Sequence, residues 1–247
     1  MKMTRLLLII LVTSLSYSTS QAQFGKLLDK AKESASSLKK IGSGEDGLDI
    51  SGGLKEALEN GVSEAVTSLS STDGYLESPY KILVPEDAQK VINTVKKVPG
   101  FQDVDKKLIA KMNEAAEVAA KKATPIFVDA ITSMSITDAK DILFGNDDAA
   151  TRYLEKSSRE ALYGAFMPVI QDALSQVGAT KYWNSVVTKY NKLPLTKDVN
   201  PNLDDHVNNK ALDGMFGLIK VKEDGIRKDV SQRTSPLLKD VFGKLDN

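Results

Sequence analysis

Residues 51–69 read "SGGLKEALENGVSEAVTSL", and apolar side chains recur in this stretch at steps of three and four residues. This spacing brings the apolar residues to one face of an α-helix, because the helix completes a turn in 3.6 residues. The face consists of Leu54, Leu58, Val62, Ala65, Val66 and Leu69. Ser51 precedes the repeat and is of a residue type that caps helix N-termini. We therefore predict an amphipathic helix capped by Ser51.

The same spacing continues along the rest of the chain, with Pro and Gly residues between the repeats. It predicts helices over residues 85–95, 104–134, 147–177, 181–190, 203–229 and 235–242. Pro125 is expected to break or kink the second of these helices, and Pro168 to interrupt the third. Residues 71–84 and 191–202 have the composition of irregular connections, and no run of alternating β-branched residues predicts a strand. We expect an all-α protein, a single-domain multi-helix bundle over residues 51–247 with no significant β-sheet.

The first 22 residues have the layout of a secretory signal peptide. Lys2 and Arg5 give a basic start, and residues 6–12 form an apolar run. Residues 20–22, Ser-Gln-Ala, place small side chains where a signal peptidase cleaves. The apolar run is far shorter than the roughly 20 residues of a membrane-spanning helix. We expect cleavage after Ala22, export to the periplasm as a soluble protein, and no transmembrane segment after cleavage.

Residues 23–50 are expected to form a short amphipathic helix followed by a glycine-rich linker. In the linker, Gly42, Gly44 and Gly47 match the G-x-G-x-x-G pattern of dinucleotide-binding loops letter for letter. No apolar strand precedes these glycines, and the two acidic residues between them would repel a pyrophosphate. The match therefore predicts no nucleotide site.

The composition argues against several classes of function. The 33 basic and 33 acidic residues balance, so the chain has no general attraction for nucleic-acid backbones. Cysteine is absent and histidine occurs once, as His206, which excludes disulfides, a lipoprotein anchor, and a zinc site built from nitrogen and sulfur ligands. No G-x-S-x-G elbow for a nucleophilic serine occurs. We expect no catalytic residue of these classes, no cofactor and no nucleic-acid partner.

Residues 135–156, "SITDAKDILFGNDDAATRYLEK", crowd acidic side chains around Gly145 in the manner of a calcium loop. The spacing does not fit such a loop, because apolar or basic residues fall at the required oxygen-ligand positions. Helix capping accounts for the same residues: Thr137 would cap a short helix, and Gly145 would end it in the left-handed conformation. Asn146 or Asp147 would cap the next helix. We therefore predict helix ends here and no metal.

Five motifs in this chain occur together in a fixed order. They are "GLKEALENGVSEAV" (53–66), "MNEAAEVAAKKATPIF" (112–127), "DAKDILFG" (138–145) with "AATRYL" (149–154), "KALDGMFGLIKVKEDGIRKD" (210–229) and "RTSPLLKDVFG" (233–243). In order and spacing they resemble a bacterial family known as domain of unknown function 4197. The resemblance implies an exported, helical, single-domain protein and supplies no established reaction, ligand or partner.

The motifs of this resemblance contain polar residues set against apolar helix faces. They are Asn113, Glu117, Asp138, Thr151, Tyr153, Lys210, Asp213, Arg227 and Arg233. Because buried polar groups need hydrogen-bond partners, these residues form either an internal network or the lining of a pocket; the network is favoured, since buried polar groups are usually structural. Glu223 and Arg227 stand four residues apart, which predicts a helix-surface salt bridge worth roughly 0.2–0.5 kcal/mol.

The last two predicted helices should form a stability unit rather than an active site. Apolar residues at helical spacing give them faces that can pack against one core: Leu212, Met215, Phe216, Ile219, Ile226, Leu237, Leu238, Val241 and Phe242. Ser235 and Pro236 have the cap and first-position residues typical of a helix start. Arg227 and Arg233, near the connection, can bond helix-end carbonyls or acids.

The sequence favours a non-enzymatic binding or interaction protein of the cell envelope. Its partner would be an apolar small molecule held between helices, or another envelope protein. Methionines on or near apolar faces suit an adaptable surface, although ordinary core packing explains the same residues: Met112, Met134, Met167 and Met215. Two alternatives stay open. One is a carboxylate-dependent hydrolase, for which Glu114 and Glu117 are a candidate pair; the other is a structural or assembly role.

Overall fold

The computed structural model describes residues 48–137, 139–194 and 202–246. The predicted signal peptide, nearly all of the segment over residues 23–50, and Asp138 lie outside this part of the chain. The described residues form nine α-helices and two short 3-10 helices, and they contain no strand. The prediction of an all-α, multi-helix protein is therefore confirmed.

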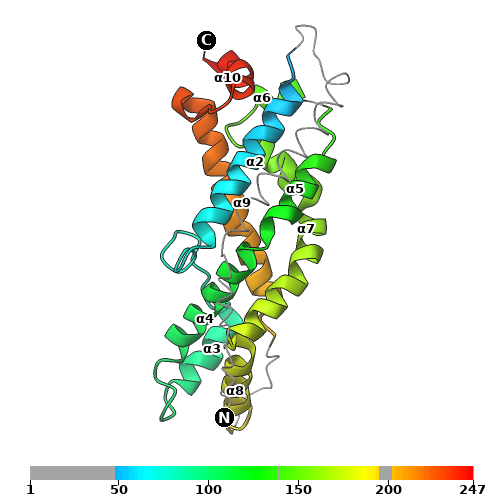
Figure 1. Cartoon of the computed structure of the whole chain (residues 1–247). Coiled ribbons are helices and arrows are strands. Elements are labelled where there is room, and N and C mark those ends of the chain that lie inside the picture. The colour runs from blue at the N-terminus through cyan, green and yellow to red at the C-terminus, as the bar shows by residue number, and fades with distance from the viewer. Residues whose placement is uncertain (1–47, 138, 195–201, 247) are drawn as a thin grey trace, which may run out of the picture. The chain divides into compact units, whose positions relative to one another are not determined.

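The helices follow one another along the chain as labelled in Figure 1. They are α2 (Ile50–Leu69), α3 (Glu86–Val95), α4 (Val104–Ala120), α5 (Ala123–Ser133), α6 (Ala139–Leu143), α7 (Ala149–Gln176), α8 (Ala179–Asn191), α9 (Asp204–Lys228) and α10 (Pro236–Phe242). The 3-10 helices η1 (Val230–Gln232) and η2 (Gly243–Leu245) flank α10.

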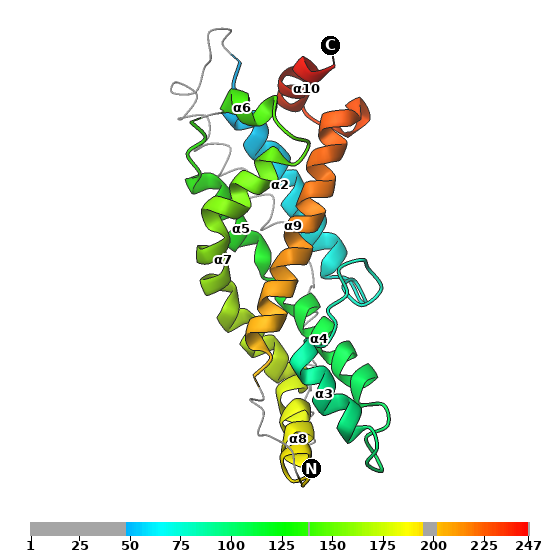
Figure 2. The same ribbon diagram turned by 180° about the vertical axis from the view of Figure 1, so that it is seen from behind.

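Helix α9 runs through the middle of the bundle, with α2 along one side and α7 along another (Figures 1 and 2). Helices α3, α4 and α8 pack together near the start of α9, whereas α6 and α10 lie near its end. A Cβ atom at Gly61 of α2 would lie only 3.1 Å from the Cα of Ile219 of α9. The two helices therefore approach so closely that a larger residue at position 61 would force them apart.

Several helix ends confirm the sequence predictions. Helix α3 begins directly after Pro85, and Gly178 ends α7 in the left-handed conformation, with φ 70°. The Ser235 hydroxyl accepts the backbone N–H of Leu238 at 3.1 Å, and Pro236 takes the first position of α10. Val241 of α10 packs against Gly53 of α2, and α10 also contacts α9. The C-terminal helix thus joins the core that α2 and α9 share.

Two predicted helix starts are wrong in detail. Asp49, rather than Ser51, caps α2: its Oδ1 accepts the N–H of Gly52 at 2.8 Å, while the Ser51 hydroxyl donates to the carbonyl of Ile136. The break between α4 and α5 falls at residues 121–122, before Pro125. Pro125 instead lies in the first turn of α5, where its missing N–H removes no helix bond.

Three further predictions about helix interruptions and ends are also wrong. Pro168 lies inside α7, which continues through it. Gly145 does not adopt a left-handed conformation; a Cβ there would lie 2.8 Å from the carbonyl oxygen of Asp141, so close packing favours glycine. Neither Asn146 nor Asp147 is the cap of α7, since Asp148 holds the N-cap position and its side chain makes no capping bond.

Within the ranges described, no helix is both long enough and apolar enough to span a bilayer.

Candidate functional site

The polar motif residues do not converge on one place. Asp138 lies outside the described residues, and the other eight fall into separate groups on α4, at the start of α7, along α9 and, for Arg233, directly after η1. Most of them bond backbone groups of irregular segments or helix ends.

Asn113 and Glu117 occupy one face of α4 and hold the segment that connects α2 to α3. The Asn113 side chain accepts the N–H of Ile82 at 2.8 Å and donates to the Ile82 carbonyl at 2.9 Å. The Glu117 carboxylate accepts the N–H of Tyr75 at 3.4 Å. This segment is neither helix nor strand, so its backbone groups lack a regular pattern of hydrogen bonds. The side chains of Asn113 and Glu117 supply partners for its buried backbone groups.

The Glu223 junction joins α6, α7 and α9. We use this name for the side chains of Glu223, Arg227 and Thr151 together with the backbone groups of Ala150, Ile142 and Leu143. Glu223 is fully buried, and its two carboxylate oxygens accept the backbone N–H groups of Ala150 and Thr151 at 3.0 and 2.7 Å. The Thr151 hydroxyl donates to the same carboxylate at 2.6 Å. Glu223 therefore caps the N-terminus of α7 from another helix.

Arg227 completes the junction. Its Nε donates to Glu223 at 2.9 Å, and its two terminal nitrogens donate to the carbonyls of Leu143 and Ile142 at 2.6 and 3.1 Å. A carboxylate thus meets the positive end of α7 and a guanidinium meets the carbonyl end of α6, which is the favourable arrangement at both ends. The prediction of a surface salt bridge between Glu223 and Arg227 is wrong, since both side chains are buried.

Arg233 closes the C-terminal end of α9. Its guanidinium donates to the carbonyls of Ile226 and Arg227, both at 2.9 Å, and pairs with the Asp246 carboxylate. The hydrogen bonds from Arg233 hold the pKa of Asp246 below its usual range. These contacts fix the last carbonyls of α9 and bring the chain end back to it.

The remaining motif residues lie toward the surface. The Tyr153 hydroxyl donates to the carbonyl of Ser135. Asp213 accepts hydrogen bonds from Lys210 of the same helix and from Arg159 of α7. Exposed ion pairs of this kind contribute about 0–1 kcal/mol, so they add little to stability.

An acidic pocket of about 330 Å³ lies beside α4. Its lining includes Asp73, Glu114, Glu117 and Lys121, together with the hydroxyl-bearing residues 70–72. Burial raises the pKa of Glu117, although backbone N–H groups of the 73–76 segment oppose that shift. The pocket therefore brings together the carboxylate pair that the sequence suggested.

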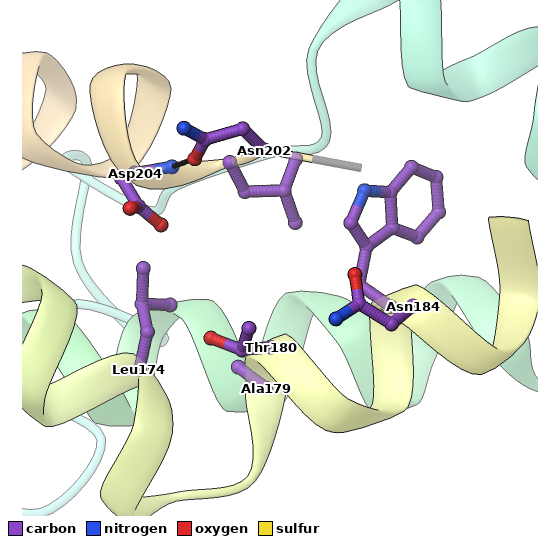
Figure 3. A pocket seen from close by; sticks show the side chains of 8 residues that line it. Leu174, Ala179, Thr180, Asn184, Asn202 and Asp204 are labelled. Atoms are coloured by element: carbon purple, nitrogen blue, oxygen red, sulfur yellow. Dashed lines mark hydrogen bonds between the residues drawn. The ribbon is translucent and has the colours of Figure 1, made fainter. Parts of the chain in front are cut away.

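A second cavity, of about 230 Å³, lies where α7 gives way to α8 and where α9 begins. We call it the Trp183 cavity; its lining is Leu174, Ala179, Thr180, Trp183, Asn184, Asn202, Leu203 and Asp204. Figure 3 shows Asp204 and Asn202 across the cavity from Ala179 and Thr180, with the Asp204 carboxylate turned toward the space between them. The walls therefore combine apolar and polar groups.

The indole N–H of Trp183 is buried and has no hydrogen-bond partner within the described part of the chain. Asp105 and Asn208 also each have one buried oxygen without a partner, but each of these side chains makes a hydrogen bond through its other polar atom. Trp183 has a single polar atom and makes none. This unpaired donor sets the Trp183 cavity apart from the satisfied polar groups elsewhere.

Over the same described ranges, no three His, Cys, Asp or Glu side chains come together in a way that could hold a metal ion. The sole histidine, His206, has its Nε2 2.7 Å from the carbonyl oxygen of Leu83.

Comparison with protein families shows that residues 45–243 match the family described as protein of unknown function, DUF4197. The match covers most of the chain, so this protein belongs to that family, as its motifs predicted. Comparisons with curated proteins and with solved structures find no match.

Proposed function

We propose that this DUF4197 protein is an exported, non-enzymatic binding protein of the cell envelope that takes a small molecule into the Trp183 cavity. The observation that carries the proposal is that Trp183, a lining residue of that cavity, has a buried indole N–H with no partner among the described residues. Leaving a buried donor unpaired costs about 1–3 kcal/mol. A ligand that supplies an acceptor would remove this penalty, so the cavity favours an occupant.

Export is supported by the first 22 residues alone. A basic start, a short apolar run and small residues before Gln23 are the features that a secretion signal combines. The intact mass of the protein recovered from the periplasm should therefore correspond to a chain that begins at Gln23. A protein that retained Met1 would contradict this part of the proposal.

The motif residues support binding over catalysis because most of them are already engaged in holding the backbone. Asn113, Tyr153, Arg227 and Arg233 each bond main-chain groups of other segments. A side chain that fixes buried backbone is not free to transfer protons or to attack a substrate. We therefore assign these residues to the fold rather than to a reaction.

The test is native mass spectrometry of protein purified from the cell envelope. We expect a small molecule to remain bound to the parent protein. Thr180→Phe, which places a ring at the lining of the cavity, should abolish this extra mass. Thr188→Phe makes the same change at an exposed position of α8 outside the lining and should retain it. Loss of the extra mass in both variants, or its absence from the parent, would contradict the proposal.

The acidic pocket favours one second candidate, a carboxylate-dependent hydrolase. A carboxyl group with a raised pKa can serve as a general acid, and Glu117 shares its pocket with Glu114. Glu117 also holds the N–H of Tyr75, so Glu114→Gln is the cleaner variant. An ester- or glycoside-cleaving activity that is lost in a normally folded Glu114→Gln protein would support the hydrolase. Absence of both a bound molecule and such activity would leave a structural or assembly role.

A further inference from the structure

We infer that the ligand of the Trp183 cavity is a small zwitterion, a molecule the size of one amino acid that carries an ammonium group, a carboxylate and an apolar side chain. This inference rests on the binding function proposed above and adds the chemical class of the ligand. It follows from three properties of the cavity, namely its size, the opposite character of its two ends, and its apolar walls.

The size limits the ligand. The cavity has a volume of about 230 Å³, whereas pockets for drug-sized molecules measure roughly 300–1,000 Å³. At roughly 30 Å³ for each water of the liquid, this space corresponds to only several waters. A peptide or a lipid chain is therefore too large, and a single amino acid is of a suitable size.

One end of the cavity favours a cation. Asp204, in the first turn of α9, lines the cavity, and no lysine or arginine is among its described lining residues. Its Oδ2 accepts a hydrogen bond from the neutral side chain of Gln171 at 3.0 Å, so none of the described lining residues neutralises its charge. Figure 3 shows the carboxylate facing the open space. An ammonium group placed there would neutralise the charge and fill the remaining acceptor positions.

The opposite end favours an anion. Ala179 and Thr180, the first two residues of α8, line the cavity. No side chain caps this helix end in the described chain, and its first turn contains no acidic residue. The first N–H groups of a helix lack intrahelical partners and carry a partial positive charge, so they suit a carboxylate.

The unpaired indole supplies an independent sign of a ligand at this end. Trp183 follows Ala179 by four residues, which places both on the same face of α8. Trp183 is 1% exposed, and its indole N–H has no hydrogen-bond partner among the described residues. Together with the first N–H groups of α8, which no described side chain caps, it gives this part of the cavity several donors opposite the Asp204 carboxylate.

The walls between the two ends are apolar. Leu174 and Leu203 line this part of the cavity with the ring of Trp183. An aliphatic side chain would bury its surface against these residues, at roughly 25 cal/mol for each Å² removed from water. The ligand that satisfies all three requirements is an aliphatic amino acid or a close analogue.

Trp183 also makes the experiment direct, because it is the only tryptophan of the chain. Its fluorescence would be titrated with three molecules of the same carbon skeleton: L-leucine, L-leucinamide, which lacks the carboxylate, and 4-methylpentanoate, which lacks the ammonium. Isothermal titration calorimetry would confirm each affinity. We expect L-leucine to bind about tenfold or more tightly than either analogue, the difference that corresponds to losing one charged hydrogen bond.

Two neighbouring variants test the role of Asp204. Asp204→Asn should weaken the binding of L-leucine and L-leucinamide by about tenfold and leave 4-methylpentanoate unchanged. Asp205→Asn removes the adjacent carboxylate from the same first turn of α9, but Asp205 is not among the lining residues, so this variant should bind L-leucine like the parent. The pair separates a contact with the ligand from a general effect of acidic residues at a helix N-terminus.

Equal affinity for the three molecules, an unchanged Asp204→Asn, or no binding of any of them would overturn the zwitterion inference. The binding function itself is judged by native mass spectrometry. If that measurement shows a bound molecule that Thr180→Phe displaces, while none of the three molecules binds, the ligand class is wrong and the proposed function stands. If it shows no bound molecule and none of the three binds, both fail.

Discussion

The Glu223 junction and the Trp183 cavity both bury polar groups, and they differ in whether these groups have hydrogen-bond partners. At the junction, both oxygens of Glu223 and all three nitrogens of Arg227 have partners within the chain. At the cavity, the Trp183 N–H has no partner in the described residues, and no side chain caps the adjacent helix. The polar groups of the junction therefore stabilise the fold, whereas we propose that a ligand pairs the indole N–H at the cavity.

The largest expected effect comes from breaking the junction. Glu223→Ala would leave the buried Arg227 guanidinium without its counter-charge and would uncap α7, so we expect a loss of about 3–5 kcal/mol in the free energy of unfolding. Denaturant unfolding measures this directly. The comparison is the double variant Glu223→Leu with Arg227→Met, which leaves no unpaired charge but still removes the side-chain partners of the Ala150 and Thr151 N–H groups and of the Ile142 and Leu143 carbonyls. A double variant as unstable as Glu223→Ala would show that the loss does not come from an unpaired charge.

Phe242 tests the apolar side of the same junction. Its fully buried ring lies under the Arg227 guanidinium, 5.7 Å from the ring centroid. Phe242→Ala should lower the free energy of unfolding by about 3–5 kcal/mol, without leaving a charge unpaired. Phe144→Ala is the matched control, since Phe144 is 61% exposed. Equal stability of the two variants would mean that α10 is a detachable tail rather than part of the core.

Asn113 provides a test, with a smaller expected effect, of a buried side chain whose hydrogen bonds hold the backbone. Asn113→Ala would remove the partners of both the N–H and the carbonyl of Ile82, and we expect a loss of about 1–3 kcal/mol. Asn93→Ala, at an exposed position of α3, should change stability by less than about 0.5 kcal/mol. Hydrogen exchange would add a local measurement, because the Ile82 amide should lose protection in the first variant only.

Asp148, at the N-cap of α7, gives a prediction of pH dependence. Burial alone would raise the pKa of its carboxyl group, but hydrogen bonds from Arg152 and Lys220 outweigh that effect and lower the pKa. The folded protein therefore binds this proton less readily than the unfolded chain. The stability that this lowered pKa contributes is fully present when the pH is above the ordinary pKa of aspartate, about 3.9. It is lost as the pH falls from that value through the pKa of Asp148 in the folded protein.

Asp148→Asn should accordingly be less stable than the parent at neutral pH, by up to about 1 kcal/mol. The difference should shrink when unfolding is measured at progressively lower pH below about 4. Asp147→Asn removes the neighbouring exposed carboxylate and serves as the control. A difference between parent and Asp148→Asn that grows on acidification would mean that the pKa shift has the opposite sign.

The sequence predicted the helices well because their apolar spacing is a local property. It also predicted the ends that depend on a residue's own chemistry, such as Gly178 and the pair Ser235–Pro236. The errors at Ser51 and Gly145 have a different origin. Ser51 is a good cap, but Asp49 takes that role while the Ser51 hydroxyl bonds Ile136, 85 residues away. Both Asp49 and Ser51 are suitable capping residues, and contacts with residues distant in the sequence determine which of them caps the helix.

The candidate site was harder to predict for the same reason. The four-residue spacing of Glu223 and Arg227 indicated a pair, but its burial depends on α6 and α7 covering it from more than 70 residues away. The Trp183 cavity requires the end of α7, the start of α8 and the start of α9 to meet. The only sequence signal was that Trp183 is the sole tryptophan, in a short helix between a glycine and a loop.

The smallest expected loss of stability belongs to the cavity. Since Trp183 is the only tryptophan, growing cells on β-(3-benzothienyl)alanine in place of tryptophan would change one position and replace the indole N–H by sulfur with nearly the same shape. Removing a paired buried donor would cost about 0.5–1.5 kcal/mol, the net contribution of its hydrogen bond. The Trp183 N–H has no acceptor among the described residues, so the isostere breaks no hydrogen bond and removes the penalty of an unpaired donor. We therefore expect no loss in the free energy of unfolding, and a gain of up to about 1–3 kcal/mol.

Tyr75→Phe is the matched comparison for that isostere. It removes the buried Tyr75 hydroxyl, which donates to the carbonyl of Ala211 at 2.9 Å, and should cost about 0.5–1.5 kcal/mol. If the tryptophan isostere proves as destabilising as Tyr75→Phe, the indole N–H is paired and the contrast between junction and cavity is lost. If its stability is not reduced but its affinity for 4-methylpentanoate falls, calorimetry will have located the ligand's carboxylate at the indole, because the only group removed is a donor that the described residues leave unpaired.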